Sequence, residues 1–188
     1  MGLFDRLFSG RFTQPPPDEP QLSDAAIMRE LYPFAAQLKT FTHALLAHLP
    51  EKERARLVRR VSRYYNLGEE PATALVRGLL GTEKDPLPDH RVLMAVDVHG
   101  VNDFGYLAPK LLETSGIEQA YAYAGEETPT MVQVLVDFDQ WLTRFAKRFL
   151  HVDTGGDEYV GCIVEQDGVE NLMALAKQAG IDARLDPF

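Results

Sequence analysis

The chain has 188 residues, of which 45% are hydrophobic and 10% aromatic, so it can bury a core and is not disordered throughout. The formal net charge of −9 lies entirely in residues 91–188, which contain 7 basic and 16 acidic side chains, whereas residues 1–90 contain 12 of each. That second half repels polyanions, which disfavours nucleic acid and favours a basic protein or a cation as partner.

No apolar stretch approaches the roughly 18 residues of a membrane-spanning helix, and no signal-peptide pattern opens the chain. We therefore expect a cytoplasmic protein. Cys162 is the only cysteine, and its place in an apolar run predicts a buried, unreactive thiol. No glycine-rich phosphate loop or other cofactor motif is present, so no cofactor is expected. The oligomeric state stays open.

Residues 1–20 are predicted to form an N-terminal peptide followed by a linker. The proline-rich stretch of residues 14–20 favours an extended conformation. An amphipathic helix before it could dock on its own domain, on a partner groove or on a membrane surface. The apolar side chains at helical spacing in this peptide are Leu3, Phe4, Leu7 and Phe8.

Residues 21–90 are predicted to be helical, with breaks at prolines and a glycine. The predicted helices cover residues 22–49 with a break at Pro33, residues 51–67 with Gly68 as the stop, and residues 71–80. The second of them carries an arginine-rich stripe beside tyrosines, a pattern that can bind nucleic acid or anionic lipid. Nearby glutamates favour ion pairs within the protein instead.

Residues 91–188 are predicted to form two strand–loop–helix–strand units. The first has a buried strand at residues 92–98, a helix capped by Asn102 or Asp103 that stops at Gly116, and a strand from Ile117. The second has a strand at residues 158–165, a helix opened by an Asp167–Glu170 capping pair that stops at Gly180, and a strand from Ile181.

Between the two units, residues 131–149 carry apolar side chains at helical spacing, although their first part also fits a strand. We predict a helix because the 3.6-residue pattern runs further. A hairpin follows, with strands at residues 149–153 and 158–165 joined by residues 154–157. The predicted fold class is thus α/β or α+β, with the helical region packed on a small sheet and residues 21–188 forming one globular domain.

Acidic and histidine side chains follow the first predicted strand and surround the hairpin. If the two loops converge, carboxylates and imidazoles could hold a divalent cation and activate a water molecule. Capping and turn formation explain the same residue types without a ligand. The candidate cluster is Asp97, His99, Asp103, His151, Asp153 and Asp157.

Two short stretches of the second half resemble a family of bacterial domains of unknown function. The first is the strand-to-helix unit from Leu93 to Gly116, which contains Val96 and Asp97. The second is the hairpin Asp153-Thr-Gly-Gly-Asp157-Glu-Tyr159, which leads towards Gly180 and Ile181. The resemblance implies a bacterial origin and brings no catalytic residues with it.

Three functions follow from these patterns. The first is a cytoplasmic protein-binding module, for example an inhibitor or immunity protein whose acidic half covers a basic toxin or nuclease. The second is a divalent-metal-dependent hydrolase that uses the Asp and His loops. The third is an adaptor tethered to a membrane or partner through the N-terminal peptide.

Overall fold

The computed structural model describes residues 30–81 and 90–188. They fall into two compact units: Glu30 and Leu31 belong to the first, and the second extends from Tyr32 to Phe188. The predicted docking side chains of the N-terminal peptide, Leu3, Phe4, Leu7 and Phe8, lie outside the described residues.

The second unit is a mixed α/β domain, as predicted, with a helical N-terminal region and an antiparallel four-stranded sheet. Its elements are α2 (Ala35–Leu45), α3 (Glu51–Asn66), α4 (Pro71–Leu80), β1 (Met94–Asp97), α5 (Val101–Thr114), α6 (Met131–Leu142), η1 (Thr143–Phe145), β2 (Lys147–Val152), β3 (Glu158–Glu165), η2 (Gln166–Gly168), α7 (Val169–Gln178) and β4 (Ala183–Arg184). None of the helices in the described ranges is long and apolar enough to cross a membrane.

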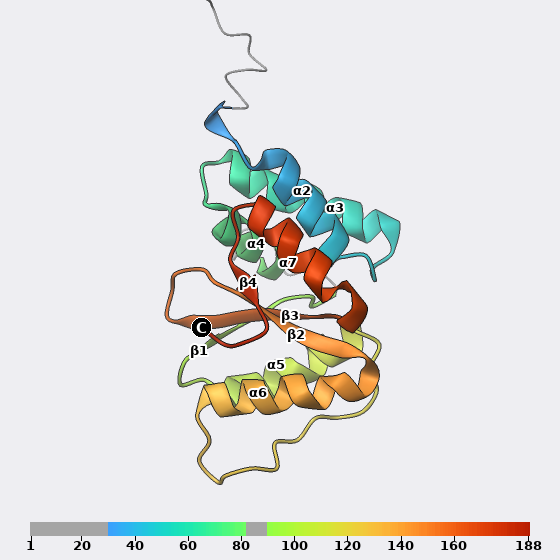
Figure 1. The fold of residues 1–188 in the computed structure, drawn as a ribbon, viewed down its shortest axis with the longest axis vertical. Helices are drawn as coiled ribbons and strands as arrows, with labels where there is room; N and C mark the ends of the chain where they lie inside the picture. Colours follow the sequence, from blue (N-terminus) through green and yellow to red (C-terminus); the bar gives the residue numbers. More distant parts are fainter. Residues whose placement is uncertain (1–29, 82–89) are drawn as a thin grey trace, which may run out of the picture. The chain divides into compact units, whose positions relative to one another are not determined.

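The order of the strands, β1-β3-β2-β4, places helices on both faces of the sheet. Every neighbouring pair is antiparallel, so β1 runs parallel to β2, and β3 runs parallel to β4. Two connections join these parallel strands: β1 to β2 through α5 and α6, and β3 to β4 through α7. Each connection crosses over one strand and moves in the same direction across the sheet, but β1 and β3, from which they start, run in opposite directions. Because crossovers between parallel strands are right-handed, the two connections must cover opposite faces. Figure 1 shows α5 and α6 on one side of the sheet and α7 with α2 to α4 on the other.

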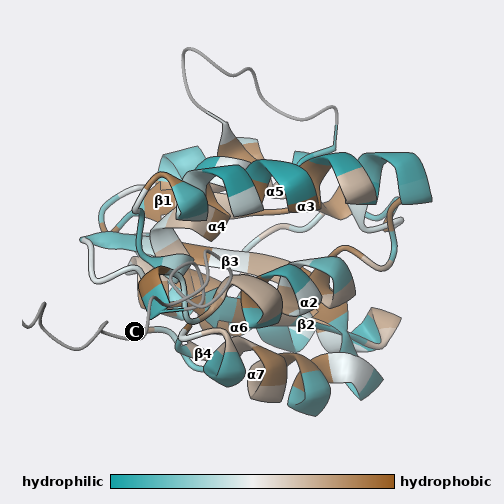
Figure 2. Ribbon diagram, turned by 90° about the horizontal axis from the view of Figure 1, so that it is seen from above, coloured by the Kyte–Doolittle hydropathy of each residue, from teal (hydrophilic) through white to brown (hydrophobic). Residues whose placement is uncertain are grey.

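Alternation along the strands divides their side chains between two cores. Leu150 and Val152 of β2 belong to the core beneath α2, α3, α4 and α7, together with Val160, Cys162 and Val164 of β3. Phe149 of β2, Ile163 of β3 and Met94 and Val96 of β1 belong to the core beneath α5 and α6. Figure 2 shows the strands as largely hydrophobic, whereas the helices have hydrophilic and hydrophobic faces. Each fully buried Leu or Phe contributes about 1.5–3 kcal/mol to this packing.

Gly161 in the middle of β3 makes room for an aromatic ring on the α5–α6 side. A Cβ atom at this position would lie 2.4 Å from Cε1 of Phe149 and 2.9 Å from the carbonyl oxygen of Leu150. Phe149 is fully buried and packs edge to face on Phe138 of α6, with ring centroids 5.6 Å apart. The glycine therefore lets β2 carry a large ring towards α6 without separating the strands.

Several predicted helix boundaries are confirmed. The chain is not helical at residues 32–34, around Pro33. Gly116 and Gly180 follow α5 and α7 with φ angles of +73° and +74°, the left-handed conformation that ends many helices. The helix chosen for residues from 131 onwards forms, and Thr130 caps it in a reciprocal pair with Gln133.

The predicted side-chain caps of α5 and α7 are wrong. Gly100 and Gly168 are the N-cap residues, and neither helix has a side-chain cap. Asp103 lies in the first turn of α5, where a negative charge still favours the helix dipole. Asp167 lies in η2, because this extra turn separates β3 from α7.

The strand predicted from Ile117 does not form. Ile117 is buried, and Tyr121 and Tyr123 pack on the α5–α6 core, so the alternating side chains contact helices instead of pairing with a strand. In the second predicted strand–loop–helix–strand unit, from residue 158 onwards, β3, α7 and β4 form in the predicted order, although β4 is short and begins at Ala183.

Candidate functional site

The register of the sheet brings the two predicted polar loops to the same end of the strands. Asp97 at the end of β1 pairs with Glu158 at the start of β3. The backbone N–H of Asp153, after β2, donates to the carbonyl oxygen of Asp182, before β4 (3.0 Å). We call the exposed carboxylates at this end the acidic rim: Asp97, Asp153, Asp157, Glu158 and Asp182.

Two of the rim carboxylates stabilise the turns in which they lie. Oδ1 of Asp97 accepts the N–H of His99 (2.8 Å), and Oδ1 of Asp153 accepts the N–H of Gly155 (2.7 Å). These are the hydrogen bonds by which Asp favours turns. No group of three or more His, Cys, Asp or Glu side chains suited to a metal ion is found among residues 30–81 and 90–188. Asp97 and Asp153 thus have turn-forming roles, and the five exposed carboxylates of the rim together make this end a charged surface.

His151 lies beneath the rim instead of within it. It is 1% exposed, its ring packs edge to face on Phe149 with centroids 4.9 Å apart, and neither ring nitrogen has a hydrogen-bond partner in the described structure. Burial lowers its pKa to about 4, an effect that Asp139 opposes and Arg184 reinforces. His151 is thus a neutral core side chain near pH 7, and it is not placed to act with Asp97 or His99.

The rim continues into a layer with a strong excess of acidic side chains. We call residues 97–142, from the end of β1 through α5, the segment of residues 115–130 and α6, the acidic layer. It contains one lysine, Lys110, and eight acidic residues: Asp97, Asp103, Glu113, Glu118, Glu126, Glu127, Asp137 and Asp139.

The two half-buried carboxylates of the acidic layer have structural partners. Asp139 accepts two parallel hydrogen bonds from the Arg148 guanidinium (3.0 and 2.7 Å) and one from the N–H of Phe149 (2.6 Å). The hydroxyl of Tyr121 donates to Asp137 (2.7 Å), and burial together with this bond raises the tyrosine pKa. These contacts join α6 to β2 and to the segment of residues 115–130.

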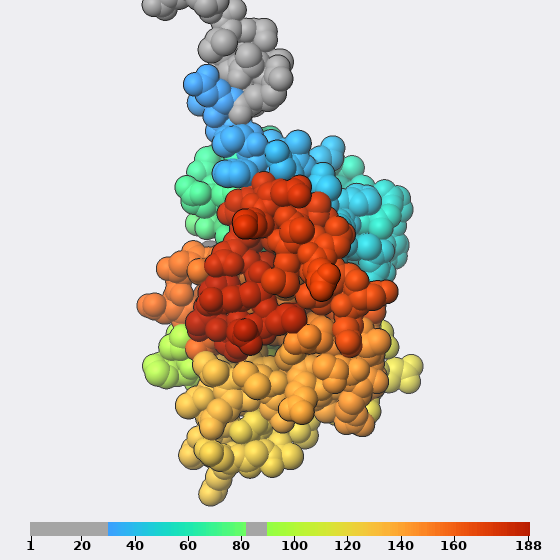
Figure 3. Space-filling model, in the orientation of Figure 1, coloured from blue at the N-terminus to red at the C-terminus, as the bar shows by residue number. Residues whose placement is uncertain are grey.

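The six exposed carboxylates of the acidic layer form no ion pair in the described part of the chain. Lys110 does not neutralise them, because its ammonium lies 4.2 Å from the centroid of the Tyr106 ring and donates to the Tyr106 hydroxyl (3.1 Å). Figure 3 shows the segment of residues 115–130 and α6, in yellow and orange, open to solvent on the face drawn.

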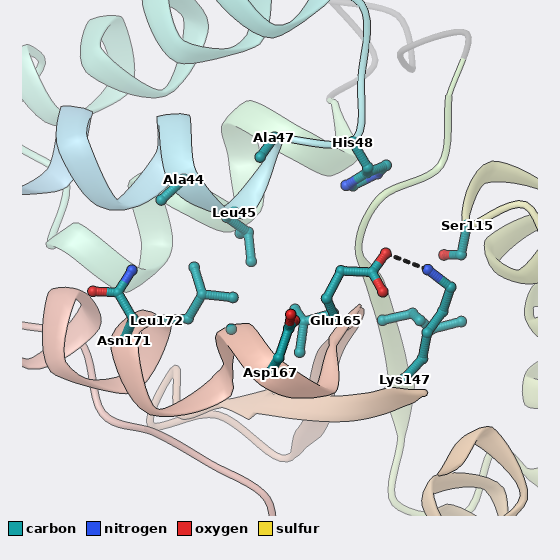
Figure 4. Close-up of a pocket in the computed structure, with 13 residues that line it drawn as sticks. Ala44, Leu45, Ala47, His48, Ser115, Lys147, Glu165, Asp167, Asn171 and Leu172 are labelled. Atoms are coloured by element: carbon teal, nitrogen blue, oxygen red, sulfur yellow. Dashed lines mark hydrogen bonds and ion pairs between the residues drawn. The ribbon is translucent and has the colours of Figure 1, made fainter. Parts of the chain in front are cut away.

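A cavity of about 340 Å³ lies at the opposite end of the sheet, between the end of α2 and the start of α7 (Figure 4). Its walls are mostly apolar, and Lys147 and Glu165, neighbours on β2 and β3, line it and form an ion pair with each other. Partial burial, with the nearby Lys147 charge, lowers the pKa of His48 at its edge. Lys147 and Glu165 here are already paired with each other, and Asp167 is the one carboxylate of the lining without an ion pair in the described structure, whereas the six exposed carboxylates of the acidic layer are all unpaired there.

Sequence reasoning missed Asp182 of the rim and the Lys147–Glu165 pair of the cavity, because both depend on strand pairing. Glu158 was expected beside the hairpin, but its place next to Asp97 also follows only from strand pairing. The sequence does contain a signal for the acidic layer, because only one basic residue interrupts the acidic residues between Asp97 and Asp139.

These features define the class of protein: a three-layer α/β domain with helices on both faces of an antiparallel sheet and an unpaired acidic surface on one side. The chain belongs to the family described as "Domain of unknown function (DUF6630)", whose model matches residues 40–186. Neither a search of curated proteins nor a search of solved structures found a match.

Proposed function

We propose that this domain is a protein-binding module that presents its acidic layer and acidic rim to a basic protein partner. The observation that carries the proposal is the set of six exposed carboxylates in the layer that form no ion pair within the described structure. A surface of one sign attracts a basic partner over roughly a Debye length, about 8–10 Å, and accelerates association. An inhibitor or immunity protein that covers a basic toxin or nuclease would use this electrostatic complementarity.

The unpaired charge is better explained by binding than by folding. Like charges gathered on one layer repel each other and lower the stability of the compact state. Departures from locally favourable design are expected at functional surfaces. In the layer around α2 to α4, by contrast, Glu51, Glu53 and Glu69 each pair with an arginine.

Exposed apolar side chains accompany the charge, as a protein interface requires. Tyr106 on α5 is 68% exposed, and Val132 and Val136 are exposed one turn apart on α6. Aromatic residues are enriched at interfaces, where a few buried anchors supply most of the binding energy. The acidic layer therefore offers contact area as well as charge. The cytoplasm is the location that we propose for this interaction.

The experiment begins with the full-length protein carrying a photo-crosslinking residue at position 126, with position 70 on the opposite side as the matched control. Mass spectrometry of cross-linked host proteins should identify a basic protein at position 126 and not at position 70. The purified partner is then titrated with wild type and with Glu126→Gln/Glu127→Gln. We expect at least about fivefold weaker binding by the variant in about 50 mM NaCl, and convergence in about 300 mM.

The control variant Glu70→Gln/Glu170→Gln removes the same charge outside the acidic layer and should bind as wild type does. An affinity that is equally insensitive to salt and to both pairs of substitutions would overturn the proposal. So would a partner that cross-links at position 126 but carries an acidic contact surface.

A further inference from the structure

An apolar groove of about 210 Å³ lies within the acidic layer, between α5 and the segment of residues 115–130. Phe104, Gly105, Ala108 and Pro109 of α5 line one side, and Tyr121 and Tyr123 line the other. This volume is below the roughly 300 Å³ at which small-molecule sites begin. The groove is therefore of a size for one or two side chains.

Two residues of α5 leave the groove open. A Cβ atom on Gly105 would meet no atom within 4 Å, so the space beside it is empty in the structure. Pro109, one turn later, has no N–H and cannot donate to the carbonyl oxygen of Gly105 as a helical residue would. Gly105 thus leaves open space beside the apolar walls, and its carbonyl oxygen lacks the usual helical donor.

The aromatic wall is held in place before any ligand binds. The ring of Tyr121 packs edge to face on Phe104 and Phe138, with centroids 6.0 and 4.9 Å away. Its hydroxyl is anchored on Asp137 (2.7 Å). Because these contacts restrict the side chains already, little conformational entropy is lost when an anchor enters.

Exposed acidic side chains lie on both of the segments that line the groove. Asp103 and Glu113 are exposed on α5, and Glu118, Glu126 and Glu127 are exposed on the segment of residues 115–130. A segment that binds here must bring positive charge beside its apolar anchor. Charge complementarity therefore selects a basic peptide segment as the occupant.

We infer that this groove receives one apolar side chain, of leucine or phenylalanine size, from a lysine- or arginine-rich segment of a protein partner. The inference rests on the proposed function and adds a specific anchor point to it. Acidic side chains attract the segment, and the groove selects among basic segments by the apolar residue they carry.

Two synthetic peptides test the inference: a short lysine–alanine peptide with one central leucine, and the same peptide with alanine in its place. Trp141, the only tryptophan, lies 5.5 Å from Tyr121 between ring centroids, so its fluorescence reports on the groove. Burial of the leucine should make wild type bind the leucine peptide about tenfold more tightly. Equal affinity for the two peptides would overturn the inference.

Gly105→Leu places a side chain in the groove at a position where an added Cβ meets only open space. Leucine is also a better helix former than glycine, so the variant should fold. This variant should bind both peptides equally, at the affinity of wild type for the alanine peptide. Gln178→Leu, an exposed addition on α7, should retain the tenfold preference. If the preference survives Gly105→Leu, the groove is not the anchor site, although the proposed function stands. If neither peptide binds wild type, both fail.

Discussion

The layers on the two sides of the sheet use charge in opposite ways. The helical layer of residues 35–80 contains eight basic and four acidic side chains, and three of the four acids are ion-paired with arginines. The acidic layer contains eight acids and one lysine, and its single ion pair in the described structure attaches α6 to β2 through Asp139 and Arg148. Both layers bury a continuous apolar face on the same strands. Packing therefore accounts for both layers, whereas six exposed acidic side chains of the acidic layer have no ion pair in the described structure, against one, Glu70, in the helical layer.

The largest expected effect follows from crowding the sheet beneath the acidic layer. Gly161→Ala places a methyl group against the Phe149 ring and the Leu150 carbonyl, and we expect the free energy of unfolding to fall by about 3 kcal/mol. Urea denaturation measures it. Gly168→Ala, where an added Cβ meets no atom within 4 Å, is the control and should change stability far less.

Loss of the carboxylate that joins α6 to β2 should follow in magnitude. Asp139→Ala leaves the Arg148 guanidinium and the Phe149 N–H without their acceptor, which should cost about 2–3 kcal/mol in urea denaturation. The matched control in the helical layer is Glu53→Ala, which removes a pair with the exposed Arg56 and takes no backbone acceptor away, and which should cost less than about 1 kcal/mol. Equal losses would mean that the Asp139 contacts are not structurally important.

The buried imidazole under the rim predicts a pH dependence. The folded-state pKa of His151 is about 4 and its ordinary value is 6.5. Below pH 6.5 the unfolded chain therefore binds a proton that the folded chain does not. Stability should be insensitive to this group above pH 6.5 and should fall by about 2 kcal/mol from about pH 7 to about pH 4.5.

His151→Leu should remove this component of the acid destabilisation, since it deletes the two unpartnered ring nitrogens and remains apolar. His99→Gln, at an exposed histidine on the loop after β1, is the control and should leave it in place. Chemical denaturation at each pH is the measurement. A His151→Leu protein with an unchanged pH profile would show that the imidazole is hydrated or charged in the folded state.

The smallest effect bears most directly on the comparison of the layers. Glu126→Gln/Glu127→Gln should raise stability by about 0.5 kcal/mol at low salt, because it relieves repulsion within the acidic layer. Glu51→Gln/Glu53→Gln should lower it, because it breaks pairs with Arg54 and Arg56. Both effects should shrink in about 1 M NaCl, where the Debye length is about 3 Å. Shifts of the same sign would remove the distinction between the layers.

Much of the fold could be predicted from local patterns. Apolar side chains at a spacing of 3.6 residues predict α6, and prolines and glycines mark both ends of α3 and α4 and the C-terminal ends of α5 and α7. The segment from Ile117 to Tyr123 was predicted wrongly because alternation tells which side chains are buried, not whether they meet a strand or a helix. The cap residues of α5 and α7 were also wrong, since a side chain can cap a helix only if the chain enters at a suitable angle.

The sequence by itself determined the helical region, the hairpin, the buried Cys162 and the one-sided distribution of acidic residues, because these depend on composition and short-range spacing. Only the tertiary structure decided which distant residues meet. Strand register placed Asp97 beside Glu158 and turned His151 into the core, away from the neighbours with which it had been grouped. Register depends on the packing of both faces of the whole sheet, so it cannot be predicted from a local pattern.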